Sequence, residues 1–128
     1  MLSLMAMSLM QVASTPGITQ LICDEYANGQ PNGIVWRVTL NEGQGYVDYQ
    51  EIQPEVRAAT RRPATFAPDS VQWRTSDRGH PVSGFIPEMG VSRIHLKLVL
   101  VDLDFVTGKF KGYRSSQCRI AEIPDRAF

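Results

Sequence analysis

Residues 91–105 read VSRIHLKLVLVDLDF and carry the strongest β-strand pattern in the chain. From 94 to 100 every second residue is Ile or Leu, and from 99 to 105 the opposite parity is also apolar. Alternation with a period of two is typical of a half-buried strand. Because the buried side changes partway along, we expect a β-bulge or a strand that crosses from one sheet to another.

Similar patterns lie on both sides of this stretch and are separated by Gly-rich turns. Trp36 shares a parity with apolar neighbours and is expected to point inward. Asn-Gly pairs accept the positive φ that tight turns require. Together these segments predict an all-β fold, either a small antiparallel β-barrel or a two-sheet sandwich of about 6–8 strands with little helix. The further strands are expected at 18–26, 34–40, 46–50, 70–75 and 110–120.

Three connecting regions are irregular. Residues 51–69 contain three prolines that interrupt any long element, and residues 55–62 (EVRAATRR) suit either one or two helical turns or a surface loop. Residues 76–90, rich in Gly and Pro, form a long connection of the kind that is mobile or functional. Residues 106–109 are expected to turn, with Gly108 in the left-handed conformation of a bulged hairpin.

Composition limits the possible functions. The 128 residues suffice for one domain, and a hydrophobic fraction of 43% is ordinary for a globular protein. Thirteen basic residues balance thirteen acidic ones, and this neutrality argues against a general nucleic-acid binder. No apolar run reaches the roughly 20 residues of a transmembrane helix. We therefore expect neither a nucleic-acid partner nor a transmembrane span.

The first part of the chain is distinct. Residues 1–15 form an apolar N-terminal segment, and residues 16–128 are interpreted as a single β domain. The segment resembles the apolar core of a secretory signal, but no Lys or Arg precedes it. We interpret it as a truncated signal peptide and expect a periplasmic or secreted protein. The alternative is an N-terminal extension of a protein that is never exported.

The two cysteines lie near opposite ends of the expected domain. Cys23 falls in the first expected strand and Cys118 in the last, and such strands are often neighbours in a closed β domain. Cys118 shares a parity with Phe110 and Ile120, which directs its sulfur inward. We predict a disulfide between them, conditional on export. Two buried free thiols, or one reactive thiol, are the alternatives.

Chemistry-bearing residues do not form a recognisable catalytic pattern. His80 and His95 have no acid or nucleophile close in sequence, and no two zinc ligands have the spacing of a structural site. Asp102 and Asp104 are expected to point the same way on one strand, but too few oxygens accompany them for calcium. We expect no cofactor, no metal and no enzymatic activity.

Partner contact is expected at a basic cluster and a loop. Arg57, Arg61 and Arg62 lie close together in sequence and can contact phosphate or carboxylate groups. His80 and Phe85 lie in the long Gly/Pro-rich connection. These five residues are the candidate contacts with an unknown protein or small ligand.

Short motifs resemble small exported bacterial proteins of unknown function. They are Leu21-Ile22-Cys23 in the first strand, Leu103-Asp104-Phe105 before the Val106-Thr107-Gly108 turn, and Cys118 in the final strand. In that family the turn is commonly preceded by an Arg where this chain has Phe105. The resemblance implies a periplasmic β domain and no activity.

A fainter resemblance is to the membrane-bound inhibitors of c-type lysozyme, which are also small barrels with an early and a late cysteine. Their pattern has a Tyr-x-Cys start and a Ser-Gly-x-x-Tyr loop. This chain has Leu21-Ile22-Cys23 and Ser83-Gly84-Phe85 instead. This resemblance implies no inhibitor residue in this chain.

The sequence therefore favours a non-enzymatic binding or structural protein that acts through loops around residues 55–65 and 76–90. One alternative is a protein inhibitor of a host enzyme such as lysozyme, with the loop at 79–90 inserted into the enzyme. Another is a virion or assembly accessory protein whose apolar N-terminus packs on a neighbouring subunit. The oligomeric state is left open.

Overall fold

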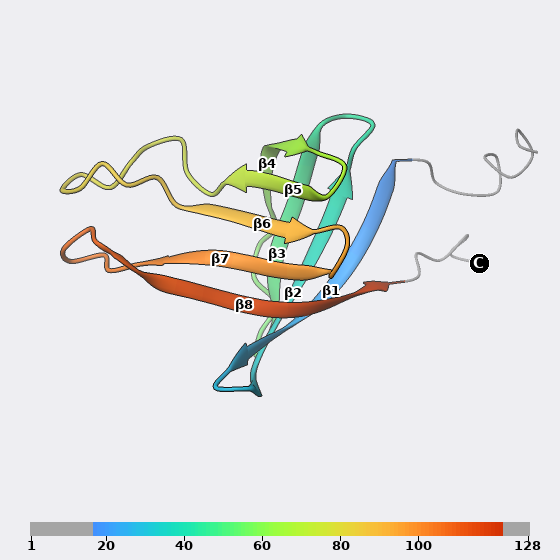
Figure 1. Ribbon diagram of the computed structural model, residues 1–128, viewed down its shortest axis with the longest axis horizontal. Helices are drawn as coiled ribbons and strands as arrows, with labels where there is room; N and C mark the ends of the chain where they lie inside the picture. The colour runs from blue at the N-terminus through green and yellow to red at the C-terminus, as the bar shows by residue number, and fades with distance from the viewer. Residues whose placement is uncertain (1–16, 122–128) are drawn as a thin grey trace, which may run out of the picture.

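The computed structural model describes residues 17–121, and this part of the chain forms a closed antiparallel barrel without helix (Figure 1). Each strand pairs with the next, and the last pairs with the first. The all-β prediction is confirmed, and the barrel is the correct one of its two alternatives. The strands are β1 (Ile18–Ala27), β2 (Gln30–Asn41), β3 (Tyr46–Gln53), β4 (Thr60–Phe66), β5 (Ser70–Arg74), β6 (Glu88–Ser92), β7 (Lys97–Leu103) and β8 (Phe110–Ala121).

The interpretations of residues 1–15 as a signal peptide or a packing segment fall outside the described residues. Among residues 17–121, which the structure describes, no helix is long and apolar enough to span a membrane.

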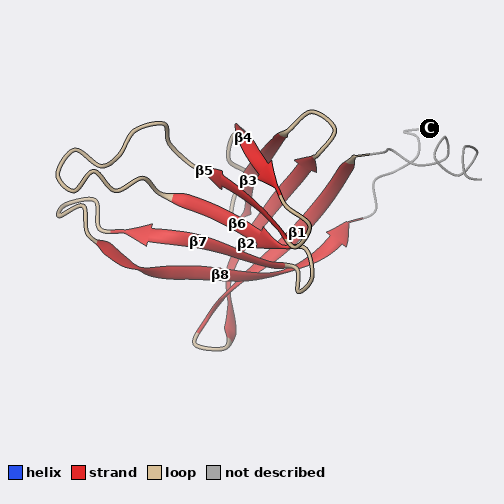
Figure 2. Cartoon of the chain, turned by 45° about the horizontal axis from the view of Figure 1, so that its top comes forward, coloured by secondary structure: helices blue, strands red, loops and turns tan. Residues whose placement is uncertain are grey.

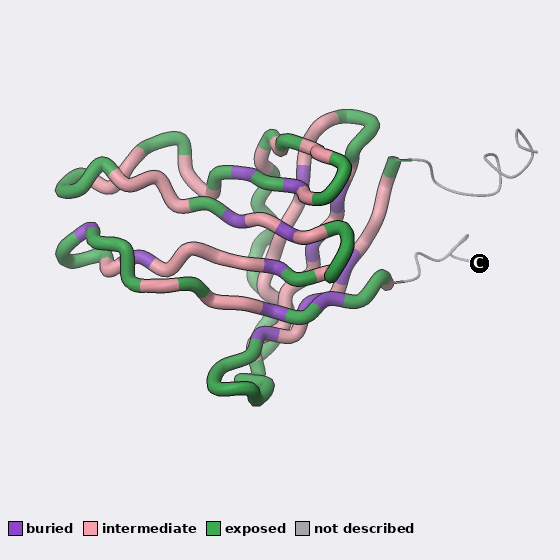
Figure 3. The backbone as a smooth tube through the Cα atoms, in the orientation of Figure 1, coloured by how far each residue is buried: buried purple, intermediate pink, exposed green. Residues whose placement is uncertain are grey.

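Alternation along the strands directs apolar side chains into the barrel. Figure 3 shows buried positions spaced along the strands, with exposed positions gathered in the connections. Trp36 packs against the core, as its parity predicts. Burial of this apolar surface is the main favourable term in folding. The buried core consists of Leu21, Cys23, Val38, Leu40, Val47, Val71, Trp73, Met89, Val91, Leu98 and Cys118.

A disulfide closes the barrel covalently. Cys23 on β1 lies directly opposite Cys118 on β8, and the two sulfur atoms are bonded at 2.06 Å. Both cysteines are buried, so the inward direction predicted for Cys118 is confirmed. The bond joins residues 95 apart in sequence. In the chain-entropy model such a loop contributes about 4–5 kcal/mol to stability.

One charged side chain is buried inside the barrel. Glu25 is 4% exposed and lies 2.8 Å from the guanidinium of Arg114 on β8. Asn32 donates to its carboxylate at 2.7 Å, and the indole of Trp36 donates at 3.3 Å. These contacts offset the cost of removing the carboxylate from water.

The prediction of one strand over residues 91–105 was wrong, because these residues contain a hairpin. β6 ends at Ser92, and β7 begins at Lys97. The Ser92 hydroxyl accepts the amides of Ile94 and His95 at 3.3 and 3.0 Å, and Leu96 adopts a φ of 53°. His95 therefore lies in the turn rather than on a strand. Arg93 and His95 in the turn continue the alternation of polar and apolar residues, so the sequence pattern does not reveal the turn.

The predicted irregularity is present, but it lies near the end of β7. The register with β8 shifts between Asp102 and Leu103, and Leu103 is buried although Leu98 has the opposite parity. Asp104 lies beyond β7, in the following turn, so it does not share a strand with Asp102 as predicted. Gly108 has a φ of 75°, which confirms its predicted left-handed conformation.

The helical alternative for residues 55–62 was also wrong, because β4 begins at Thr60. This strand includes Pro63, which lies opposite Tyr46 of β3. Pairing with β3 and β5 overrides the local preference of these residues, as is common for strands. The long connection predicted at 76–90 ends earlier, because β6 begins at Glu88.

The two ends of the barrel differ (Figures 1 and 2). At the end that we call the mouth, short turns join β2 to β3, β4 to β5 and β6 to β7. At the opposite end, long loops join β3 to β4, β5 to β6 and β7 to β8.

Candidate functional site

Two loops at the end opposite the mouth form the candidate site. They are residues 75–87, between β5 and β6, and residues 104–109, between β7 and β8, and we call them the paired loops. They lie side by side and extend beyond the ends of the strands in both views (Figures 1 and 2). Loops positioned on a rigid scaffold are where binding residues concentrate.

His80 joins one loop to the other. Its Nε2 lies 2.8 Å from the carbonyl oxygen of Phe105, and its Nδ1 accepts the amide of Val82 at 3.1 Å. These partners assign the proton of a neutral imidazole to Nε2. The backbone of His80 also closes its own loop, donating to Phe85 O at 2.7 Å and accepting the Gly84 amide at 2.7 Å. His80 therefore acts as a brace within and between the loops.

Ser83 makes a second connection between the loops. Its hydroxyl donates to the carbonyl oxygen of Gly108 and accepts the amide of Phe85 at 3.2 Å. Gly108 combines a positive φ with close packing, since a β-carbon there would collide with the His80 ring. Only glycine satisfies both conditions at this position.

Asp104 shapes the second loop. Its Oδ1 accepts the amides of Val106 and Thr107 at 2.9 and 3.2 Å. These backbone hydrogen bonds hold the pKa of the Asp104 carboxyl below its usual range. The backbone of Asp104 also accepts the Gly108 amide at 2.6 Å and donates to Lys109 O at 3.0 Å. The turn is thus held by its own polar groups.

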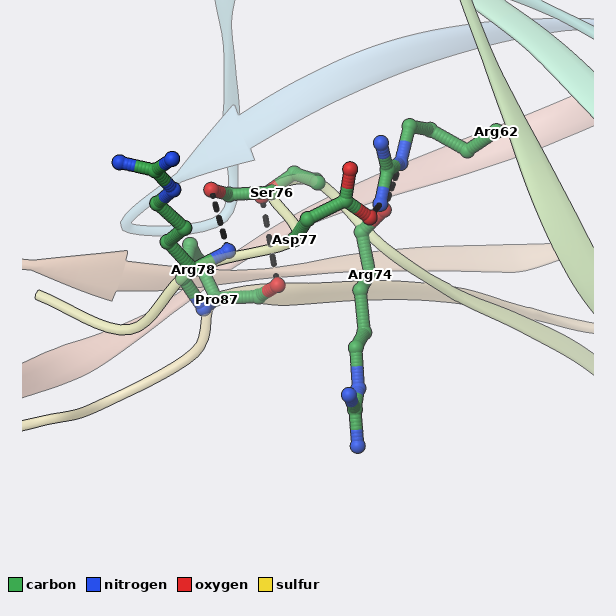
Figure 4. Close-up of polar contacts among 7 residues, drawn as sticks. Arg62, Arg74, Ser76, Asp77, Arg78 and Pro87 are labelled. Carbon is green, nitrogen blue, oxygen red and sulfur yellow. Dashed lines mark hydrogen bonds and ion pairs between the residues drawn. The ribbon is translucent and has the colours of Figure 1, made fainter.

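The base of the 75–87 loop is tied to β4 (Figure 4). Arg62 donates to the carbonyl oxygen of Arg74 at 2.8 Å and to the carboxylate of Asp77 at 2.6 Å. This hydrogen bond lowers the pKa of Asp77. The side chains of Arg74 and Arg78 point away from the cluster. Arg62 therefore anchors the loop, and Arg78 is directed outward.

Large apolar side chains are exposed on this braced frame. Val82 is 72% exposed, Phe105 84% and Val106 87%. Side chains of this kind are ordinarily exposed singly, and a group on one protrusion indicates an interaction surface.

An aromatic row continues this surface. The ring centroids of Phe85 and Phe110 lie 6.2 Å apart, and those of Phe110 and Tyr113 lie 5.1 Å apart. Phe110 is half exposed, and Tyr113 is more exposed still. The row therefore links the 75–87 loop to the start of β8 and offers aromatic area beside the tips.

Ser83, His80 and Asp104 are the residue types of a hydrolytic triad, but their hydrogen bonds serve the backbone. Both ring nitrogens of His80 face backbone groups, the Ser83 hydroxyl donates to a carbonyl oxygen, and the Asp104 carboxylate accepts amides. A triad requires instead that the histidine accept from the serine and donate to the carboxylate. The arrangement found here holds loops in place.

The five predicted contact residues do not lie together in the structure. His80 and Phe85 lie in the paired loops, and Arg62 anchors the base. Arg61 points to the outer face of β4, where it donates to both oxygens of Asp48 at 2.8 and 3.0 Å.

Arg57 lies in the loop between β3 and β4. It forms an exposed ion pair with Glu55 at 3.1 Å. Since Arg61 and Arg62 face opposite sides of their strand, the basic run of the sequence is not a single surface patch.

The exposed residues Val82, Phe105 and Val106 were not predicted as contacts. The sequence does carry a signal for the exposure of Phe105 and Val106. These two large apolar residues directly precede the Thr107-Gly108 turn, so they fall outside any buried strand. The pairing of the two loops is not visible in the sequence, since residues 25 apart form its hydrogen bonds.

Comparison with known proteins finds no matching family model, no similar curated protein and no similar solved structure. The geometry of the paired loops is therefore the basis for inferring a function. Among the described residues, no group of three or more His, Cys, Asp or Glu side chains is arranged to hold a metal ion.

Proposed function

We propose that this chain is a non-enzymatic binding protein that contacts a partner protein through the paired loops. The observation that carries this proposal is the braced protrusion, in which Val82, Phe105 and Val106 are exposed while His80 and Ser83 hold the loops together. Preorganised loops bind with a smaller loss of conformational entropy. Exposed aromatic side chains are frequent energetic centres of protein interfaces.

Site-specific photo-crosslinking in the native compartment tests this proposal. A photoreactive phenylalanine at Phe105 should capture a partner, whereas the same group at Ile94, an exposed residue at the mouth, should not. The captured protein is then purified, and its affinity is measured by calorimetry. Phe105→Ser should weaken binding about ten-fold or more, and Ile94→Ser should leave it unchanged.

Equal capture at both positions, or affinity that is unaffected by Phe105→Ser, would contradict the proposal. A reproducible hydrolase activity that disappears in His80→Ala would also contradict it, because it would assign catalysis to a residue that we describe as a brace.

We further propose that the protein is exported to the periplasm or secreted. The disulfide between Cys23 and Cys118 supports this, because such bonds are typical of oxidising compartments. Mass spectrometry of the native protein, with and without reduction, reports both the N-terminus and the cysteine state. Reduced cysteines in a protein isolated under thiol-blocking conditions would contradict export.

A second candidate is the inhibition of a host enzyme such as lysozyme by insertion of the paired loops into its cleft. The extension of both loops beyond the barrel favours this mode (Figures 1 and 2). Inhibition of c-type lysozyme by the wild-type protein, lost in Phe105→Ser, would support it. Full lysozyme activity at saturating protein would exclude that enzyme as the target.

A further inference from the structure

A hollow of ≈ 290 Å³ opens at the mouth of the barrel, at the end opposite the paired loops, and we call it the mouth cavity. Its volume is near the lower limit of about 300–1,000 Å³ for small-molecule sites. Barrels of eight strands are either filled by their own side chains or hold one small ligand. Its lining combines apolar side chains, among them Leu40, Phe66, Leu96 and Ile120, with polar groups at the rim, and the fully buried Leu21 and Val71 also border it.

The rim of the mouth cavity carries a closed ion pair. Arg93 donates to the two carboxylate oxygens of Glu42 at 2.8 and 3.4 Å, and also to the carbonyl oxygen of Ala67 at 3.0 Å. The positive charge is therefore neutralised from within the protein. A ligand carboxylate that approached Arg93 would meet the negative charge of Glu42, which costs free energy at short range.

Hydroxyl groups provide neutral polar contacts beside this pair. Thr19 and Ser92 both line the cavity. The Ser92 oxygen accepts amides of the turn, so its own proton is available to donate. This combination suits an uncharged head group that can both donate and accept a hydrogen bond.

We propose that the mouth cavity binds a small neutral amphiphile, with an aliphatic chain among the apolar walls and a hydroxyl group at the rim. Burial of the chain supplies the free energy of binding. The ion pair between Arg93 and Glu42 selects against carboxylates. This site is independent of the paired loops, so the failure of either proposal leaves the other intact.

Methyl-region NMR of the full chain tests the site with octanol as the probe. Octanol should cause saturable shifts in the methyl signals of Leu21, Leu40 and Ile120, and none in those of Val82 and Val106. Octanoate at neutral pH should bind about ten-fold or more weakly, because its carboxylate would lose hydration while Arg93 is already paired with Glu42. The absence of saturable shifts, or shifts confined to Val82 and Val106, would overturn the proposal.

Two rim variants separate location from head-group selection. Ile120 is 64% exposed, so Ile120→Trp should fold while closing the opening, and it should abolish the octanol shifts. Ile120→Val is the matched control and should bind as the wild type does. Octanol binding that survives Ile120→Trp unchanged would overturn the assigned location.

Glu42→Gln leaves Arg93 with an uncompensated charge. Octanoate should then bind at least as well as octanol, which reverses the preference of the wild type. An unchanged ratio of the two affinities would overturn the role assigned to the ion pair. A dispersed NMR spectrum for each variant shows that it is folded.

Discussion

The two ends of the barrel present apolar surface in different shapes. At the mouth, between short turns, a cavity is lined by apolar side chains and by polar rim groups whose charges are paired. At the other end, polar groups are used to brace two long loops, and Val82, Phe105 and Val106 are exposed. A concave apolar surface suits a small molecule, whereas a convex one suits a partner with a groove of its own. This difference in shape is the basis for proposing a separate binding mode at each end of the barrel.

The barrel between the two ends is expected to stabilise both. Replacing Cys23 and Cys118 together by Ala should lower the free energy of unfolding by about 4–5 kcal/mol, because the crosslink no longer restricts the unfolded chain. Urea unfolding followed by Trp fluorescence measures this. Amide exchange should accelerate at the mouth and at the paired loops alike.

Wild-type protein treated with a reductant is the control for that pair of substitutions, and it should show most of the same loss. If exchange accelerates at only one end, the two ends do not share the barrel as a common support.

The second largest loss of stability is expected when the buried carboxylate of Glu25 loses its partner. Arg114→Met should cost about 2–3 kcal/mol, because Glu25 loses its ion-pair partner while it stays buried. The value lies below the roughly 3–5 kcal/mol of fully buried pairs, since the Arg114 side chain is one-third exposed. Adding Glu25→Gln should recover part of the loss, as measured by urea unfolding. A double variant that is no more stable than Arg114→Met would contradict this account.

Two glycines in the paired loops form a matched test of the brace. Gly84 and Gly108 both have positive φ, so Ala at either position should cost about 1–2 kcal/mol of backbone strain. A β-carbon meets nothing within 4 Å at Gly84, whereas at Gly108 it collides with the ring of His80. Gly108→Ala should therefore accelerate amide exchange at Val82 and Val106, and Gly84→Ala should do so much less. Equal effects would show that the brace contributes little to the order of the loops.

The smallest effect is the pH response of the 104–109 loop. The pKa of Asp104 is lowered in the folded protein, so the carboxylate stabilises the folded loop at pH values above its unfolded pKa. This contribution is lost as the pH falls through the lowered folded pKa. Amide exchange of Val106 and Thr107, corrected for intrinsic rates, should accelerate at that acidic pH, while turn amides at the mouth change less. Asp104→Asn should remove the pH dependence.

Much of the fold could be predicted, because it depends on local pattern. The alternation around Trp36 identifies β2, and the conformation of Gly108 follows from its place in a turn. The hairpin within residues 91–105 was missed because its polar turn residues continue the period of two. β4 was missed because its pairing with β3 overrides the local preference of residues around Pro63.

The candidate site was predicted only in part. The long loop containing His80 and Phe85 is evident from its Gly and Pro content. Arg61 and Arg62 do not share one surface, because neighbouring residues on a strand point to opposite sides. The exposure of Phe105 depends on how the turn emerges from the barrel, which local pattern does not specify.

By itself, the sequence determined the β character of the chain, the inward parity of Cys118 and the left-handed turn at Gly108, because each depends on a few neighbouring residues. The disulfide predicted between Cys23 and Cys118 is confirmed. The tertiary structure alone decided that the sheet closes, that His80 meets Phe105, and that the mouth cavity opens at the other end. Alternation specifies which side of a strand is buried, but it does not specify which strand lies beside it. Those neighbours are selected by the closure of the whole barrel, which buries the core and gives every strand a neighbour on both sides.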